Sequence, residues 1–362
     1  MELQLDVKRY RSLPARVVQF DDGAILKRGA METRIRGERA LEVLQYVLET
    51  TREGVDLDDV RARFAEIDRP GLDELLRHLM DRRVIVEVRE EEAVEPTVET
   101  PESIFYWDFN QEALEARDRL RDVRLAIAGV NEVSLELERS LRRSGYENIR
   151  IIDALVFRNS RLFTSNGRLK DGFSTETTPL SIDEWGDSVK AEGVDCVVAT
   201  SDHGGAHWMR KWNELCVRSK TPFFPVCLQD MVGYIGPLVI PGETACAECL
   251  RARQNSNLES PAEDRALEPS AFQGQEVVSF HPCMPAAVAH IAAMELIKFH
   301  GKGLPNTRVG TLIEFNLLGP HVNSRKVLRI PNCTVCGQLN RHSSHALGSN
   351  SSFMPGNQRA SA

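Results

Sequence analysis

The chain has 362 residues, of which 42% are hydrophobic and 27% charged, so it is long enough for two or three domains with cores of their own. Its net charge of −8 gives no overall attraction to nucleic acid or anionic lipid. The start MELQLDVKRYRSLP lacks the apolar segment of a signal peptide, and no apolar run approaches the roughly 18 residues of a membrane span. We therefore expect a cytoplasmic protein with no membrane partner.

The first 92 residues alternate short apolar strands with amphipathic helices. Acidic residues open the second helix, as the helix dipole favours, and Pro70 opens the third. The expected strands are 15–20, 24–27, 33–36 and 84–88, and the expected helices are 38–49, 57–65 and one that follows Pro70. This order predicts a winged helix-turn-helix domain over residues 1–92.

A charged, proline-containing stretch follows and predicts a linker over residues 93–104. Residues 105–338 then read as an α/β domain. The tail 339–362 is rich in Ser, Asn and His, and we expect it to be disordered.

The α/β pattern begins with a buried strand at 123–128, which ends at Gly129, and continues with a helix at 133–143 and a strand ending at Asp153. This is one βαβ unit of a doubly wound sheet. Another buried strand, 194–200, ends near Asp202. Further strands are expected at 221–227, 234–240, 308–318 and 325–330, with helices at 206–218 and 285–300.

Two CxxC pairs, separated by 83 residues, are the most specific pattern in the chain. They are Cys246 with Cys249 and Cys333 with Cys336. Four thiolates presented by two short hairpins predict a tetrahedral structural zinc site with no open position for catalysis. The alternative is two unrelated pairs, either buried or disulfide-bonded.

These features resemble the adenylating superfamily of the ThiF and MoeB type. The residues that carry the resemblance are Gly129, Asp153, Asp202, PGETACAECL at 241–250 and PNCTVCG at 331–337. The resemblance implies a Rossmann-like α/β domain with a structural zinc site and a nucleotide pocket at the carboxyl ends of the strands.

The nucleotide loop departs from the family's pattern. Asn131 and Ser134 stand where glycines let backbone N–H groups approach phosphates, and Glu132 adds a negative charge. We therefore expect a vestigial pocket, no ATP or Mg²⁺, no catalytic residues and no enzymatic activity of the chain itself. The residues of this vestigial pocket are Gly129, Asn131, Asp153, Arg161 and Asp202. Asp202 has an alternative role as the N-cap of the helix at 206–218.

A winged helix fused to a degenerate ThiF-like domain also resembles the leader-peptide-binding partner proteins of thiazole/oxazole-modified peptide pathways, including those for thiopeptides and bacteriocins. That resemblance implies a dimeric scaffold that captures a precursor leader and presents the core to a YcaO cyclodehydratase. Two rivals remain open: an enzyme that adenylates a peptide or carrier-protein C-terminus, and a DNA-binding regulator.

Residues 1–92 hold 17 Lys and Arg against 21 Asp and Glu, which argues against a nucleic-acid partner. If the family's peptide-binding mode applies, the leader adds to the strand edge at 33–36 beside the third helix. The candidate residues are Thr33, Arg34, Ile35, Arg36, Leu72, Leu76, Arg77 and Leu79. The alternatives are solvated surface charges for the arginines and simple core for the leucines.

Overall fold

The computed structural model describes residues 8–88, 99–170, 177–179, 193–203, 206–257, 260, 279–319 and 321–337. By its contacts the chain divides into two compact units, Met1–Ala113 and Leu114–Ala362, and each is described separately below. The tail expected at 339–362 and residues 93–98 of the expected linker lie outside the described residues.

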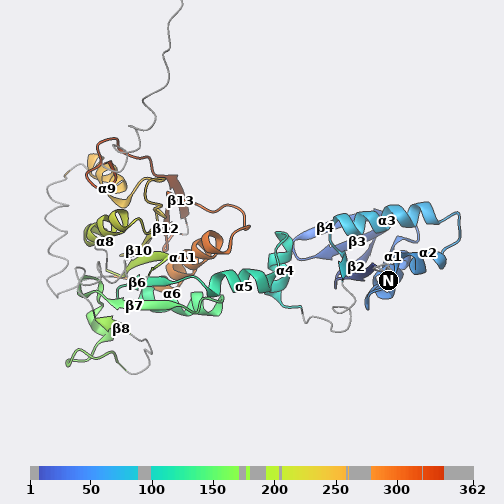
Figure 1. The fold of residues 1–362 in the computed structure, drawn as a ribbon, viewed down its shortest axis with the longest axis horizontal. Helices are drawn as coiled ribbons and strands as arrows, with labels where there is room; N and C mark the ends of the chain where they lie inside the picture. The colour runs from blue at the N-terminus through green and yellow to red at the C-terminus, as the bar shows by residue number, and fades with distance from the viewer. Residues whose placement is uncertain are drawn as a thin grey trace, which may run out of the picture. The chain divides into compact units, whose positions relative to one another are not determined.

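The first unit contains an antiparallel three-stranded sheet in the order β2-β3-β4 (Figure 1). The strands are β2 Arg16–Phe20, β3 Gly23–Arg28 and β4 Met31–Arg36, and the helices are α1 Ala40–Thr50, α2 Leu57–Ala62 and α3 Arg69–Asp81. A separate pair joins β1 Arg9–Ser12 to β5 Ile85–Val88. All of the expected strands and helices of this region are present. β1 was not expected, because its sequence Arg-Tyr-Arg-Ser has no apolar alternation.

The three helices pack on one face of this sheet and form the core of the unit. Leu72, Leu76 and Leu79 of α3 are at most 3% exposed and belong to the same buried cluster as Leu26 of β3 and Leu44 of α1. Their spacing places them on one inward face of α3. The expectation that these leucines form the floor of a peptide groove is therefore corrected: they are core residues.

A further helix, α4 Pro101–Asp108, overlaps the linker expected at 93–104. Thr100 and Ser103 form a reciprocal capping box, and Pro101 occupies the first helical position. The Thr-Pro-Glu-Ser run lies in the stretch expected to be a linker, although it is also the start signal of a helix.

Side chains from the first unit anchor α4. Arg28 is only 4% exposed and makes a bidentate ion pair with Glu99 at 2.6 and 2.7 Å, and its guanidinium lies 4.6 Å from the ring centroid of Trp107. The Trp107 indole N–H donates to the Arg83 carbonyl at the end of α3, and the Asp108 carboxylate accepts from the Ala30 N–H in the β3–β4 turn. Helix α4 therefore lies against the tip of that hairpin and the end of α3.

The second unit is built on an eight-stranded sheet in the order β13-β12-β11-β10-β9-β6-β7-β8. The five strands from β10 to β8 are parallel, whereas β11, β12 and β13 are antiparallel. The strands are β6 Leu125–Ala128, β7 Ile149–Asp153, β8 Thr177–Pro179, β9 Cys196–Ser201, β10 Phe223–Gln229, β11 Val232–Ile235, β12 Thr311–Asn316 and β13 His321–Lys326. The expected α/β architecture is confirmed, with antiparallel strands added at one edge.

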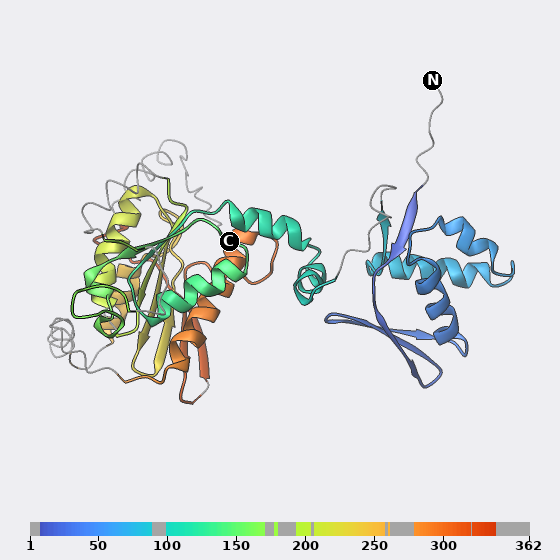
Figure 2. The same ribbon diagram turned by 90° about the horizontal axis from the view of Figure 1, so that it is seen from below.

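Helices cover both faces of this sheet (Figures 1 and 2). Helices α6 and α11 pack against each other on one face, and α8 and α9 lie on the other. The helices are α5 Ala113–Arg121, α6 Glu132–Arg143, α8 Ala206–Ser219, α9 Ala247–Ser256 and α11 Cys283–Gly301, with short 3₁₀ turns η1 Leu155–Phe157 and η2 Ser160–Leu162. Helix α9 and strand β8 were not expected. No helix in the described ranges is long and apolar enough to cross a membrane.

We predict that Leu76→Ala lowers the free energy of unfolding of the first unit by about 2–5 kcal/mol, because the side chain is fully buried and the cavity cannot close completely. Its exposed neighbour gives the control: Arg77→Ala should change stability by no more than about 0.5 kcal/mol. Urea unfolding followed by tryptophan fluorescence measures both. Equal effects of the two substitutions would contradict the assignment of Leu76 to the core.

Candidate functional site

The four cysteines of the CxxC pairs lie together in the second unit. All four are buried, and their sulfur atoms lie within 4.8 Å of one another. Cys246 Sγ lies 3.9 Å from Cys249 Sγ and 3.6 Å from Cys333 Sγ, and Cys249 Sγ lies 3.5 Å from Cys336 Sγ. A tetrahedral zinc with Zn–S bonds of about 2.3 Å requires sulfurs about 3.8 Å apart. The donor set and its spacing therefore fit zinc, and all four thiols are free rather than disulfide-bonded.

The two pairs are presented differently from what was expected. Cys246 is the N-cap of α9 and Cys249 lies within its first turn, so the first pair sits on a helix start rather than in a hairpin. The second pair sits in a turn that follows β13. Hydrogen bonds from Cys246, Cys336 and the Ile330 N–H lower the pKa of the Cys249 thiol, which favours the thiolate that a metal binds.

Gly129 and Asn131 form the loop between β6 and α6. Gly129 has φ +117°, and a Cβ there would lie 2.7 Å from the Thr200 carbonyl oxygen, so only glycine fits. The Asn131 amide, fully buried, donates to the carbonyls of Phe157 and Thr200 at 3.0 and 2.9 Å. Asn131 therefore holds three segments of the loop region together.

Asn131 is also the N-cap of α6. Its Oδ1 accepts from the Ser134 N–H at 3.0 Å, and Ser134 Oγ accepts from the Asn131 N–H at 3.0 Å. This reciprocal capping box satisfies two of the backbone donors at the start of the helix. The signal is present in the sequence as Asn-x-x-Ser, at positions where the nucleotide-binding pattern has glycines.

Asp202 supplies a third internal acceptor at the same helix start. Its Oδ2 accepts from the Glu132 N–H at 2.9 Å and from the Asn159 amide at 2.8 Å, and the residue is only 1% exposed. Asp202 thus accepts from the first N–H of α6 without being its N-cap, and among the described residues no capping bond joins Asp202 to the helix that follows it.

The other two residues of the expected pocket, Asp153 and Arg161, make their contacts with residues outside the Gly129, Asn131 and Asp202 group. Asp153 pairs with Arg158 through two hydrogen bonds. Arg161 is exposed, and its carbonyl accepts from the Lys170 side chain. The structure therefore joins Gly129, Asn131 and Asp202, while Asp153 is engaged elsewhere.

The start of α6 offers little to a phosphate. A helix N-terminus binds anions through N–H groups that lack partners, but Asn131, Glu132 and Ser134 already donate to side chains of this chain. The charge is also unfavourable, because two carboxyl groups, Glu132 and Asp202, lie at this helix start. Burial, and next the nearby Asp202 carboxylate, raise the pKa of Glu132, which shows that added negative charge is disfavoured here. A triphosphate would have to displace three hydrogen bonds and face two carboxyl groups.

In the first unit, β4 is an edge strand. Among the described residues it pairs only with β3, from Gly23 opposite Arg36 to Arg28 opposite Met31. Arg28 and Met31 close the two-residue turn and form a hydrogen-bonded pair, and along an antiparallel ladder hydrogen-bonded and non-hydrogen-bonded pairs alternate. Met31, Thr33 and Ile35 therefore bond to β3. The backbone groups of Glu32, Arg34 and Arg36 therefore point to the open side of the strand.

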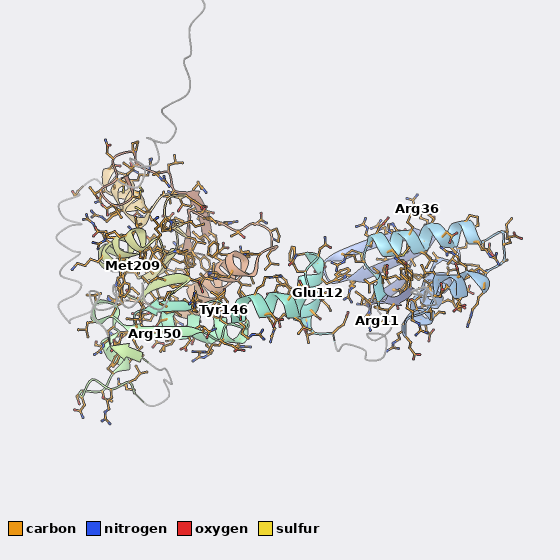
Figure 3. The ribbon with its side chains drawn as sticks, viewed as in Figure 1. Arg11, Arg36, Glu112, Tyr146, Arg150 and Met209 are labelled. Atoms are coloured by element: carbon orange, nitrogen blue, oxygen red, sulfur yellow. The ribbon has the colours of Figure 1, made fainter. Side chains whose placement is uncertain are left out.

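The expected peptide-binding residues lie on different surfaces around this edge. Thr33 is buried and its hydroxyl lies 3.0 Å from His78 Nε2, which joins β4 to α3, and Ile35 packs against the core. Arg34 and Arg36 share the outer face of the sheet, where the Arg34 guanidinium lies 4.9 Å from the Phe20 ring centroid. Arg36 is labelled in Figure 3. Arg77 is exposed on α3.

We predict that the full chain binds one zinc ion and that Cys333→Ser lowers the zinc content well below one per chain and destabilises the second unit. Three thiolates cannot close the tetrahedron, and structural zinc contributes directly to folding. Metal analysis of gel-filtered protein measures the stoichiometry. Cys283→Ser is the control, because this exposed cysteine lies outside the cluster, and it should retain full zinc.

Comparison with known proteins places the second unit in context. Residues 172–335 match the sequence model of the ThiF family. Protein HesA of Leptolyngbya boryana is 26% identical over 219 residues, which is 59% of this chain and 71% of HesA. The vegetative HesA of Trichormus variabilis is 26% identical over 226 residues, 61% of this chain and 77% of that protein.

Solved structures match both units. The E. coli MccB structure with AMPCPP and MccA aligns with a TM-score of 0.65 at 19% identity, over 91% of this chain and 99% of MccB. The heterocyclase TruD aligns with a TM-score of 0.61 at 14% identity, over 96% of this chain but only 45% of TruD. The chain thus spans about half the length of TruD. Together these likenesses show that the second unit has a ThiF-like fold and that the similarity in fold to MccB covers 91% of this chain.

Proposed function

We propose that this chain is a non-catalytic, leader-peptide-binding scaffold in the biosynthesis of ribosomally made, modified peptides. Its first unit, interpreted as a winged helix-turn-helix, captures the leader of a precursor. Its zinc-containing second unit presents the core of that precursor to a YcaO-type cyclodehydratase, which forms thiazolines or oxazolines.

The observation that carries peptide capture is the edge of β4 beside α3. Three residues of β4 direct backbone groups outward, as an added strand requires, and α3 adjoins the strand at His78, which contacts the Thr33 hydroxyl. Exposed Arg34 and Arg36 add positive charge next to this edge, which suits a leader with acidic side chains.

The absence of catalysis is supported by the start of α6. The N–H groups of Asn131, Glu132 and Ser134 already donate within the chain, so a nucleotide phosphate would have to displace these bonds. A scaffold needs no phosphate cradle. By holding the leader it raises the local concentration of the core at another active site, which increases the rate without chemistry of its own.

The relatives support a role with peptides. MccB has been solved with MccA and with N-formylated MccA, and TruD is a heterocyclase. Because TruD aligns with nearly the whole of this chain, the same architecture occurs within a protein that forms heterocycles. The YcaO partner and a homodimeric assembly are extensions of this resemblance.

A second candidate function is ATP-dependent adenylation of a peptide or carrier-protein C-terminus. It is favoured by the alignment with 99–100% of MccB, a protein solved with AMPCPP and with ATP. The purified chain would then exchange pyrophosphate into ATP when a substrate peptide is present, whereas a scaffold would show no exchange.

We predict that Arg34→Pro weakens leader binding at least about tenfold, because proline removes an outward N–H and is tolerated at an edge strand without breaking the β3–β4 ladder. The measurement is fluorescence anisotropy with the labelled N-terminal half of a candidate precursor, sought among short reading frames rich in Cys, Ser or Thr next to the gene for this chain.

Arg34→Ala is the matched control, since it removes the same side chain but keeps the N–H. If both variants lose binding equally, the guanidinium and not strand addition recognises the leader. Unchanged binding by Arg34→Pro would exclude the β4 edge as the leader site.

We also predict that Asp202→Asn leaves precursor processing by the reconstituted system within about twofold of wild type. The amide oxygen can still accept from the Glu132 N–H and the Asn159 amide, so the structural role is retained, while the charge that a magnesium ion would need is lost. Loss of processing in a folded Asp202→Asn protein would favour the adenylating enzyme instead.

A further inference from the structure

The second unit has a cavity that takes no part in the zinc cluster or the start of α6. It lies between α8, α9 and the strands β10, β11 and β12 and has a volume of about 170 Å³. Its walls include Met209, Cys227, Tyr234, Leu250 and Leu312. Figure 3 labels Met209 in this unit.

The size of the cavity suits one ring. An engineered apolar cavity of about 150 Å³ in another protein stays dry and binds benzene, so about 170 Å³ accommodates a phenyl group. A whole nucleotide or a folded domain would not fit. The occupant is therefore a single side chain or a molecule of that size.

The chemistry of the lining favours an aromatic occupant over an aliphatic one. Two buried sulfur-containing side chains, Met209 and Cys227, and the ring of Tyr234 border the space, and sulfur and aromatic groups make favourable contacts with a ring. Two guanidinium groups, Arg210 and Arg251, also line it. Cations prefer the face of an aromatic ring to that of a saturated one.

The two arginines are held in place. Glu248, only 9% exposed, accepts from Arg251 Nε at 3.0 Å, and Arg210 Nε lies 3.5 Å from the same carboxylate oxygen. Arg210 is also bonded to Glu214 at 2.9 Å. Because Glu248 and Glu214 balance the positive charges of the two arginines, the cavity has no excess positive charge that would favour a strongly anionic ligand.

The surroundings favour a polypeptide as the source of the ring. A shallow depression that shares Gln229 and Tyr234 with the cavity continues to Met231 and Leu318, which are 36% and 70% exposed. An extended chain with a ring in the cavity can lay a second apolar residue on this depression. We propose that this cavity is a docking site for an aromatic side chain of a bound polypeptide, independently of leader capture by the first unit.

The test uses the full-length chain with ¹³C-methyl-labelled methionine and two matched probes, N-acetylphenylalanine amide and N-acetylcyclohexylalanine amide. The aromatic probe should shift the Met209 methyl resonance through its ring current and bind at least about threefold more tightly than its saturated analogue. The Met294 methyl on α11 is the internal reference and should not move.

Two variants on α9 locate the site. Gln254→Trp places an indole at the cavity lining and should weaken binding at least about tenfold, whereas Arg253→Trp, its exposed neighbour outside the lining, should bind as wild type. Arg251→Gln removes one cation and should weaken binding about threefold. Zinc content verifies the fold of each variant.

Equal binding of the two probes would refute the aromatic preference. Unchanged binding by both Gln254→Trp and Arg251→Gln would place the probe elsewhere. Binding of phenol without binding of N-acetylphenylalanine amide would assign the cavity to a free small molecule. Each of these results overturns the proposal, and none of them bears on the β4 edge.

Discussion

The start of α6 shows the constraint on which the functional interpretation rests: backbone N–H groups at a helix N-terminus must find acceptors. In a phosphate-binding loop the ligand supplies them. Here Asn131, Ser134 and Asp202 supply them from within, and Asn131 also satisfies carbonyls of two neighbouring segments. A phosphate that approached this helix start would have to displace the acceptors that the N–H groups of Asn131, Glu132 and Ser134 already have.

The two units therefore differ in which backbone groups remain available to a ligand. The second has internal acceptors at the start of α6 and a cavity between α8 and α9, whereas in the described part of the first unit β4 is paired on one side only. Helix α4 fixes the tip of the β3–β4 hairpin through Asp108 and Arg28, so this edge is presented by a braced strand. Preorganised edges bind with less loss of conformational entropy than flexible ones.

The secondary structure and the cysteine cluster could largely be predicted from the sequence, because the patterns that indicate them are local in the chain. Strand alternation and helical periodicity located β2 to α3 and the β6–α6–β7 unit, and the CxxC spacing identified the four cysteines that the structure brings together. Leu72, Leu76 and Leu79 were misjudged because an apolar stripe looks the same whether it faces a core or a groove. The partners of Asp202 and the α8–α9 cavity depend on contacts between residues far apart in the chain, which no local pattern encodes.

The cysteine cluster has a consequence for the order in which the molecule is made. Because one pair opens α9 and the other follows β13, the four-sulfur site cannot exist until the ribosome has added Cys336, when every strand of the sheet has already been synthesised. Before Cys333 is added the nascent chain carries only two of the four thiols, too few to retain the ion firmly. Metal capture therefore follows the synthesis of β13, and translation products that stop before Cys333 lack half of the ligands.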